Sequence, residues 1–176
     1  MAHSPAEIVE AGYDLMAEKY LAYAAATIGD PRQRFLDELM SHLPDGSDVV
    51  DLGCGAGIPS TQALAQQHSV LGVDISASQL RLAGRHVPGA EFLKADFAEL
   101  DLPSASCDAV TAFYSMTHVP RESTHNCCGV SHRGCDPVAL CCSPSALEAR
   151  PMGFTPSSAC RCISAATGRT PTGKCC

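Results

Sequence analysis

The first chemical signal in the sequence is the glycine run DLGCGAG at residues 51–57, between a predicted strand and a predicted helix. Glycine tolerates positive φ angles and lets the backbone approach a ligand closely. The helix that follows directs free N–H groups and the positive end of its dipole at the same place. The spacing is G-x-G-x-G, and Ile58 stands where the dinucleotide pattern G-x-G-x-x-G has its last glycine. Taken alone, the loop is also compatible with a tight turn that binds nothing.

Two aspartates follow at the ends of the next two predicted strands. Asp74 comes 17 residues after Gly57, and a carboxylate there can accept two hydrogen bonds from a ribose diol. Asp96 closes the third strand beside Phe97; it could accept from an exocyclic amine while the ring packs on a base. Asp96 could instead cap a helix. Acidic residues at three successive strand ends, counting Asp51, favour a nucleoside pocket over three unrelated caps.

These residues need a scaffold, and the hydrophobic pattern supplies one. Residues 5–28 predict one or two helices, with Ser4 as a possible N-cap and Pro5 in the first turn. The other predicted helices span residues 32–42, 60–67 and 76–86, and the predicted strands span residues 49–52, 70–74, 91–95 and 108–114. Strands that alternate with helices predict an α/β fold with a doubly wound parallel sheet, whose ligands bind beyond the carboxyl ends of the strands.

Four segments in this order resemble the successive motifs of one family. They are DLGCGAG at 51–57, GVDIS at 72–76, KADF at 94–97 and CDAVTAFYSMTHVP at 107–120. The set resembles the class I S-adenosylmethionine-dependent methyltransferases that act on small molecules, and the likeness covers about residues 10–122. It implies a Rossmann-like fold, S-adenosylmethionine as the cofactor and in-line transfer of its methyl group to a small-molecule acceptor. Such a site works chiefly by positioning its reactants.

The resemblance also implies roles for single residues. Gly53, Cys54 and Gly55 would lie along the methionine part of the cofactor, with Asp51 turned towards its amino group. Asp74 would hold the ribose, and Asp96 with Phe97 the adenine. The expected cofactor residues are Tyr13, Tyr20, Asp51, Gly53, Cys54, Gly55, Asp74, Ile75, Asp96 and Phe97, where the two tyrosines form an N-terminal cap over the cofactor.

His118, just past the fourth predicted strand, is the candidate general base for an acceptor that must lose a proton. The competing interpretation is a packing or loop histidine. No metal site is expected.

Composition limits the class of partner. Residues 1–122 carry 7 Lys and Arg against 17 Asp and Glu, a poor match for a phosphate backbone, so we expect no nucleic-acid partner. No stretch reaches the roughly 18–20 apolar residues that span a bilayer, and the N-terminus lacks the pattern of a signal peptide. Cys54 and Cys107, the two cysteines of this part, suit a reducing compartment. We therefore expect a cytoplasmic protein with no membrane partner.

Residues 123–176 differ from the rest. They carry nine of the eleven cysteines, are rich in Ser and Pro, and show no helical or strand period, which predicts a disordered tail and a sheet truncated after its fourth strand. A zinc module would have to use His125, Cys127, Cys128, His132 and Cys135, whose spacing is poor. A disulfide scaffold conflicts with a reducing compartment.

Codon arithmetic offers another explanation of the tail. In a shifted frame, residues 124–143 permit AQLLRRIASWLRPGGALLL, which reads as an amphipathic helix, a turn and an apolar strand. We therefore interpret the tail as a frameshift product.

The predicted organisation is a helical cap at 1–45, the cofactor-binding half of a methyltransferase domain at 46–122 and a non-homologous tail at 123–176. In this form the enzyme is expected to be impaired or inactive. One alternative is a non-catalytic cofactor-binding or regulatory product that dimerises through its open sheet edge. The other is an NAD(P)-dependent oxidoreductase, which the glycine spacing disfavours.

Overall fold

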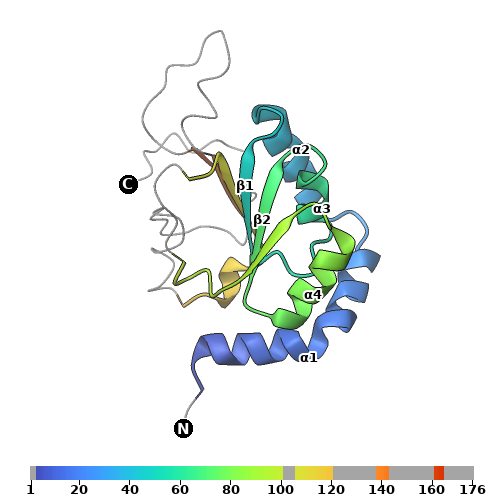
Figure 1. Cartoon of the computed structure of the whole chain (residues 1–176), viewed down its shortest axis with the longest axis vertical. Coiled ribbons are helices and arrows are strands. Elements are labelled where there is room, and N and C mark those ends of the chain that lie inside the picture. The colour runs from blue at the N-terminus through green and yellow to red at the C-terminus, as the bar shows by residue number, and fades with distance from the viewer. Residues whose placement is uncertain (1–2, 101–105, 121–137, 143–160, 165–176) are drawn as a thin grey trace.

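The computed structural model describes residues 3–100, 106–120, 138–142 and 161–164. Helices and strands alternate after residue 46, as the sequence predicts (Figure 1). The elements up to residue 120 are α1 (Pro5–Ala26), α2 (Arg32–His42), β1 (Asp48–Leu52), α3 (Ser60–Leu64), β2 (Ser69–Asp74), α4 (Ala77–His86), β3 (Glu91–Lys94), β4 (Ala109–Phe113) and the short 3-10 helix η1 (Met116–His118).

The start of α1 is fixed by a capping box. The Oγ of Ser4 accepts a hydrogen bond from the N–H of Glu7 at 3.2 Å, and Oε2 of Glu7 accepts one from the N–H of Ser4 at 2.7 Å. Pro5, which has no N–H, stands at the first helical position, where an N–H would have no partner within the helix. From this start the helix passes across one end of the sheet, at the bottom of Figure 1. Within the described residues, no helix is both long and apolar enough to cross a membrane.

The first four strands form a parallel sheet in the order β3-β2-β1-β4. In the register of the central strand, Val50 lies opposite Leu71 of β2 on one side and Val110 of β4 on the other. The chain winds outward from β1 to β3 and then returns to the other side of β1. The carboxyl ends of β1 and β4 therefore flank a topological switch point, where sheets of this class bind ligands. This order confirms the predicted Rossmann-like fold.

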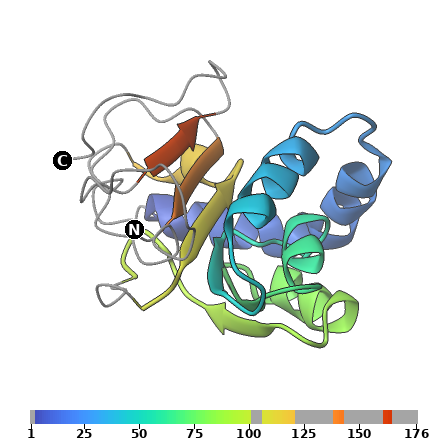
Figure 2. The same cartoon turned by 90° about the horizontal axis from the view of Figure 1, so that it is seen from above.

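The sheet has a core on each face because successive side chains of a strand point to opposite sides. Helices α2, α3 and α4 gather on one side, as Figure 2 shows. The core on the side of α2 and α3 consists of Phe35, Leu36, Leu39, Leu43, Val49, Leu64, Val70, Ala109 and Phe113. The other face buries Val50, Leu52, Val73, Phe97 and Ala112, packed against residues that include Leu100, Met116 and Val119. Both faces are therefore covered around β1.

The parallel sheet ends at β4, as the sequence predicts, but β4 is not the last strand of the whole sheet. Two further strands, β5 (Val138–Cys142) and β6 (Arg161–Ser164), continue it to six in the order β3-β2-β1-β4-β5-β6. β5 pairs antiparallel with β4, and β6 pairs antiparallel with β5. The physical reason is that an unpaired edge of N–H and C=O groups is a template for any segment that can extend beside it. The predicted tail without strands and the open edge of β4 are thereby corrected for these two segments.

The rest of the predicted tail lies outside the described residues, as do the residues of the zinc alternative. Among the residues described, no three His, Cys, Asp or Glu side chains are grouped so that they could hold a metal ion. The proposed domain boundaries at 45 and 122 stay a prediction, although α2 contributes to the same core as β1 and α3.

A buried carboxylate joins the centre of the sheet to α3. Asp51 of β1 is 1% exposed; its Oδ2 accepts from the hydroxyl of Thr61 and its Oδ1 from the hydroxyl of Thr111, both at 2.7 Å. Burial raises the pKa of Asp51 above its usual 3.8, although the two hydroxyls oppose the shift. The ionised side chain is therefore a source of instability in the folded state that the hydroxyl bonds only partly offset.

Replacing Asp51 by Asn should raise the stability of the protein at pH 7. The raised pKa means that the folded state binds a proton more tightly than the unfolded state, so the wild type loses stability as pH rises from about 4. Asparagine keeps the shape and stays neutral, so the difference in Tm between D51N and wild type should shrink as the pH falls towards 4. Thermal melts across this range measure the difference.

The matched control is Asp37→Asn on the exposed side of α2, which should leave Tm unchanged at each pH. A D51N protein less stable than wild type at pH 7 would show that the hydroxyl bonds to the charged group outweigh its desolvation.

Candidate active site

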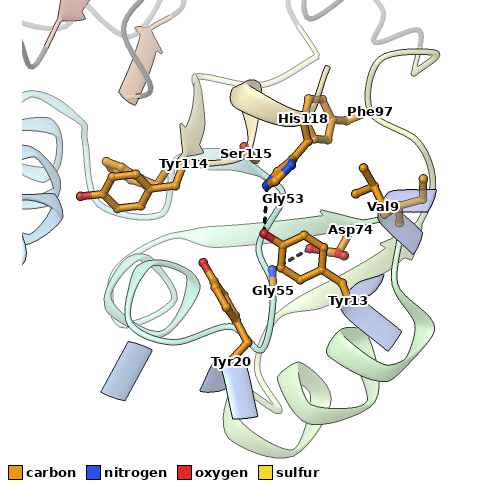
Figure 3. A pocket seen from close by; sticks show the side chains of 12 residues that line it. Val9, Tyr13, Tyr20, Gly53, Gly55, Asp74, Phe97, Tyr114, Ser115 and His118 are labelled. Atoms are coloured by element: carbon orange, nitrogen blue, oxygen red, sulfur yellow. Dashed lines mark hydrogen bonds between the residues drawn. The ribbon is translucent and has the colours of Figure 1, made fainter. Parts of the chain in front are cut away.

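A small cavity lies where β1, β2 and β4 end, between these strand ends and α1 (Figure 3). Its volume is about 60 Å³, room for a few water molecules. It brings together eight of the eleven predicted site residues, which are Tyr13, Tyr20, Gly53, Gly55, Asp74, Ile75, Phe97 and His118. The residues come from α1, from the loops after β1, β2 and β3, and from η1, so the cavity is made by segments distant in the sequence.

The glycine loop at the base of the cavity has a backbone that only glycine adopts without strain. Gly53, Gly55 and Gly57 have φ angles of 70°, 56° and 78°. A Cβ on Gly53 would also lie 2.2 Å from the Cβ of Ser115, the residue two positions after β4. The N–H of Gly53 donates to the carbonyl of Val73 at 2.7 Å, which ties the loop to β2. The sequence predicted that the backbone of this loop comes close to a ligand; in the structure it comes close to Ser115 and Val73 of the protein.

Asp74 fastens the same loop from the end of β2. Its Oδ2 accepts from the N–H of Gly55 at 2.9 Å (Figure 3). Its Oδ1 accepts from the N–H of Ser76 at 2.8 Å. The side chain is 8% exposed, and burial raises the pKa of Asp74 despite the two backbone bonds. A carboxylate has about four lone-pair directions, so Asp74, which lines the cavity, keeps capacity for a further hydrogen bond.

Tyr13 and His118 meet across the cavity. The Oη of Tyr13 and the Nε2 of His118 form a hydrogen bond of 2.9 Å, and their rings lie edge to face at 5.4 Å (Figure 3). Tyr20, two turns further along α1, contacts Tyr13 edge to face at 5.3 Å. Partial burial, followed by the nearby Tyr20 and Asp74, raises the pKa of Tyr13, so its hydroxyl keeps its proton at neutral pH. α1 and η1 are joined here over the mouth of the site.

Three predicted residues do not line the cavity. Asp51 lies below the loop with both oxygens bound to threonines, as described above. The Sγ of Cys54 points to the carbonyl of Gly55 at 3.7 Å, and burial raises the pKa of its thiol, so it is a packed and inert group. Asp96 uses Oδ1 to accept from the N–H of Ala98 at 2.9 Å, a local contact within the turn at residues 96–100, where the structure has no helix to cap.

Sequence reasoning missed four residues of the cavity wall, which are Val9, Phe113, Tyr114 and Ser115. Tyr114 has a φ of 60°, the only positive value outside glycine among the described residues. Strain of this kind is typical of functional sites. The last three residues stand in the motif that provided His118, so the motif itself marked the region although it did not assign their roles.

Tyr114 is braced by a neighbouring ion pair. Its hydroxyl donates to Asp30 at 3.3 Å, and the guanidinium of Arg32 lies 5.1 Å from the centre of its ring. Nε and Nη2 of Arg32 both donate to Oδ2 of Asp30, at 2.8 and 2.6 Å. The segment between α1 and α2 is thereby fixed to the end of β4, beside the cavity.

Comparison with known proteins gives the family. The model of the methyltransferase domain matches residues 49–137, half of the chain. Trans-aconitate 2-methyltransferase from Azoarcus sp. (strain BH72) is 37% identical over 112 residues, which cover 61% of this chain and 42% of that protein. The 27-O-demethylrifamycin SV methyltransferase from Amycolatopsis mediterranei (strain S699) is 35% identical over 105 residues, 54% of this chain and 39% of that protein. The chain thus spans about two fifths of the length of these relatives.

A solved structure agrees with this comparison. The structure of the DhpI-SAH complex superposes with a TM-score of 0.56 at 26% identity, over 70% of this chain and 60% of that one. Together with the parallel order β3-β2-β1-β4 and the glycine loop after β1, these matches show that the chain belongs to the methyltransferase domain family, in its class I, S-adenosylmethionine-dependent branch.

Proposed function

We propose that this chain binds S-adenosylmethionine in the cavity between α1 and the strand ends and that the protein transfers the methyl group to a small organic acceptor. The observation that carries the proposal is the meeting of the glycine loop, Asp74 and Phe97 at the switch point of the sheet. The names of the relatives support the acceptor class, since trans-aconitate and demethylrifamycin are small molecules. The acidic balance of residues 1–122 supports the expectation of no nucleic-acid partner.

The residues of the cavity fit the parts of this cofactor. Asp74 has lone pairs left for the two ribose hydroxyls, and Ile75 and Phe97 offer apolar walls for the adenine. Asp96 keeps its second carboxylate oxygen for the exocyclic amine. Gly53 and Gly55 expose backbone along the methionine part, while Asp51 and Cys54 support that loop from beneath. When bound, the cofactor supplies an electrophilic methyl group on its sulfonium sulfur.

The protein's own part in the reaction is to position the reactants and to accept a proton. α1 carries Tyr13 and Tyr20 over the site and excludes water from it. Where the acceptor is a hydroxyl, we propose that its proton passes through the hydroxyl of Tyr13 to Nε2 of His118, because those two atoms already share a hydrogen bond. His118 is then the general base, and Tyr13 relays the proton: its oxygen accepts the proton of the acceptor as its own proton moves to Nε2 of His118.

Binding measurements test the cofactor directly. The full chain should bind S-adenosylhomocysteine and not NAD in titration calorimetry, and Asp74→Ala should weaken binding by about 1.5–3 kcal/mol, the value of hydrogen bonds to a charged acceptor. Asp37→Ala, on the exposed side of α2, is the matched control and should bind as the wild type does. Tighter binding of NAD would replace this proposal with the oxidoreductase alternative.

Substitution of Gly53 by Ala should abolish binding. The new Cβ would overlap the side chain of Ser115, and the φ of 70° would strain any residue with a Cβ, so the loop must move. Gly84→Ala is the control, because Gly84 lies in the interior of α4 with open space where its Cβ would be. G84A should gain about 0.5–1 kcal/mol in stability and bind normally. Equal binding by G53A would remove the loop from the site.

Tyr13→Phe should speed both the association and the dissociation of S-adenosylhomocysteine, each by a few-fold, with little change in Kd. The present cavity is far smaller than a nucleoside, so α1 must open, and the bond from Tyr13 to His118 is one tie that opening breaks. Surface plasmon resonance measures both rates. The control is Tyr23→Phe, 71% exposed on the same helix, which should change neither rate. Unchanged rates in Y13F would mean that the bond does not gate entry.

A further inference from the structure

The underside of the glycine loop rests on α4. A Cβ at Gly57 would come within 3.1 Å of Val87 Cγ2 and 3.4 Å of Ala83, so the loop packs directly on the end of this helix. Nδ1 of His86 also lies 3.0 Å from the carbonyl oxygen of Ala56. Contacts with one face of α4 therefore fix the position of the loop from Gly55 to Gly57.

Gln79 lies on the same face of α4, four residues before Ala83, and it is unusual there because its polar side chain is fully buried. Its side chain is 0% exposed, and neither Oε1 nor Nε2 has a hydrogen-bond partner among the described residues. Oε1 is the nearest atom to the position of a Cβ on Gly55, at 3.8 Å. The buried amide thus sits directly under the part of the loop whose N–H binds Asp74.

A buried amide without partners destabilises a protein, and an apolar side chain of the same length would fit the site better. Native structures rarely keep such a group, and where one occurs it calls for an explanation such as strain or a role in function. The amide of Gln79 can both donate and accept, and the backbone of the loop offers both kinds of partner. Oε1 already lies beside Gly55, so a rearrangement of the loop can bring the amide and the loop backbone within bonding distance.

We propose that Gln79 is a positioning residue of the cofactor site: its amide hydrogen-bonds to the backbone of the glycine loop when the methionine part of the cofactor settles on Gly53 and Gly55. The ligand then selects the loop arrangement in which the amide is paired, and part of its affinity comes from this pairing. The inference rests on the proposed cofactor, and it adds a residue that touches neither the cofactor nor the acceptor.

The test is Gln79→Met in the full chain, with S-adenosylhomocysteine as the probe. Methionine fills the same volume without polar atoms, so the ligand-free variant should melt several degrees higher than the wild type. Its affinity for S-adenosylhomocysteine should fall roughly fivefold to tenfold, the equivalent of one hydrogen bond or slightly more. Gln66→Met, on the exposed part of the turn after α3, is the matched control and should change neither quantity.

A higher Tm together with a weaker affinity in Q79M would distinguish this role, because substitution of a purely structural residue would lower both Tm and affinity. Amide hydrogen exchange of Gly55 to Gly57 adds a direct measurement: the probe should slow it more in the wild type than in Q79M. Equal affinity of wild type and Q79M would overturn this inference and leave the proposed cofactor standing. A Q79M protein that fails to fold, or that melts lower, would overturn it as well. A wild type that does not bind the probe would overturn both.

Discussion

The turn of the chain directly after β1 is the constraint on which the site depends. At Gly53 the backbone takes a left-handed conformation while the end of β4 approaches so closely that no Cβ can fit between them. Ser115 uses this proximity, since its Oγ donates to the carbonyl of Leu52 at 2.8 Å. β1 and β4 therefore separate only beyond this contact, and the space that opens there is the cavity. Asp74 and α4 hold the loop from its other two sides.

Local signals in the sequence predicted the first four strands and the helices between them well. Short apolar runs such as 70–74 end at a polar residue, and Ser4 with Glu7 marks the start of α1, so each boundary depends on residues only a few positions apart. The helix after the glycine loop is shorter than predicted. It ends at Leu64 instead of Gln67, because the N–H groups of Gln66 and Gln67 bond to the carbonyls three residues back, Ala63 and Leu64, at 3.3 and 3.2 Å, so a tighter turn replaces the α-helix.

Features that depend on distant partners could not be predicted in the same way. Tyr13 and His118 are 105 residues apart, and no periodicity indicates that they meet. For Asp96 the sequence allowed two roles, a ligand contact or a helix cap. The structure shows that the N–H of Ala98 donates to Oδ1, and this local bond gives no information about the role of Oδ2. The pairing of β5 with β4 was missed because five residues in a segment rich in Cys and Ser show no strand period, while the free edge of β4 supplies the partner.

The way in which α1 is attached has a consequence for the energetics of opening. Of its 22 residues only Ala17 is buried, whereas Ile8, Leu15, Met16 and Tyr23 remain exposed. The helix is held instead by side-chain bonds at its rim, from Glu10 to Lys94, from Asp14 to Ser76 and from Tyr13 to His118. Such contacts break one at a time and leave the two cores of the sheet intact. α1 is thus a unit of low local stability, able to unfold or swing away at a small fraction of the free energy of global unfolding.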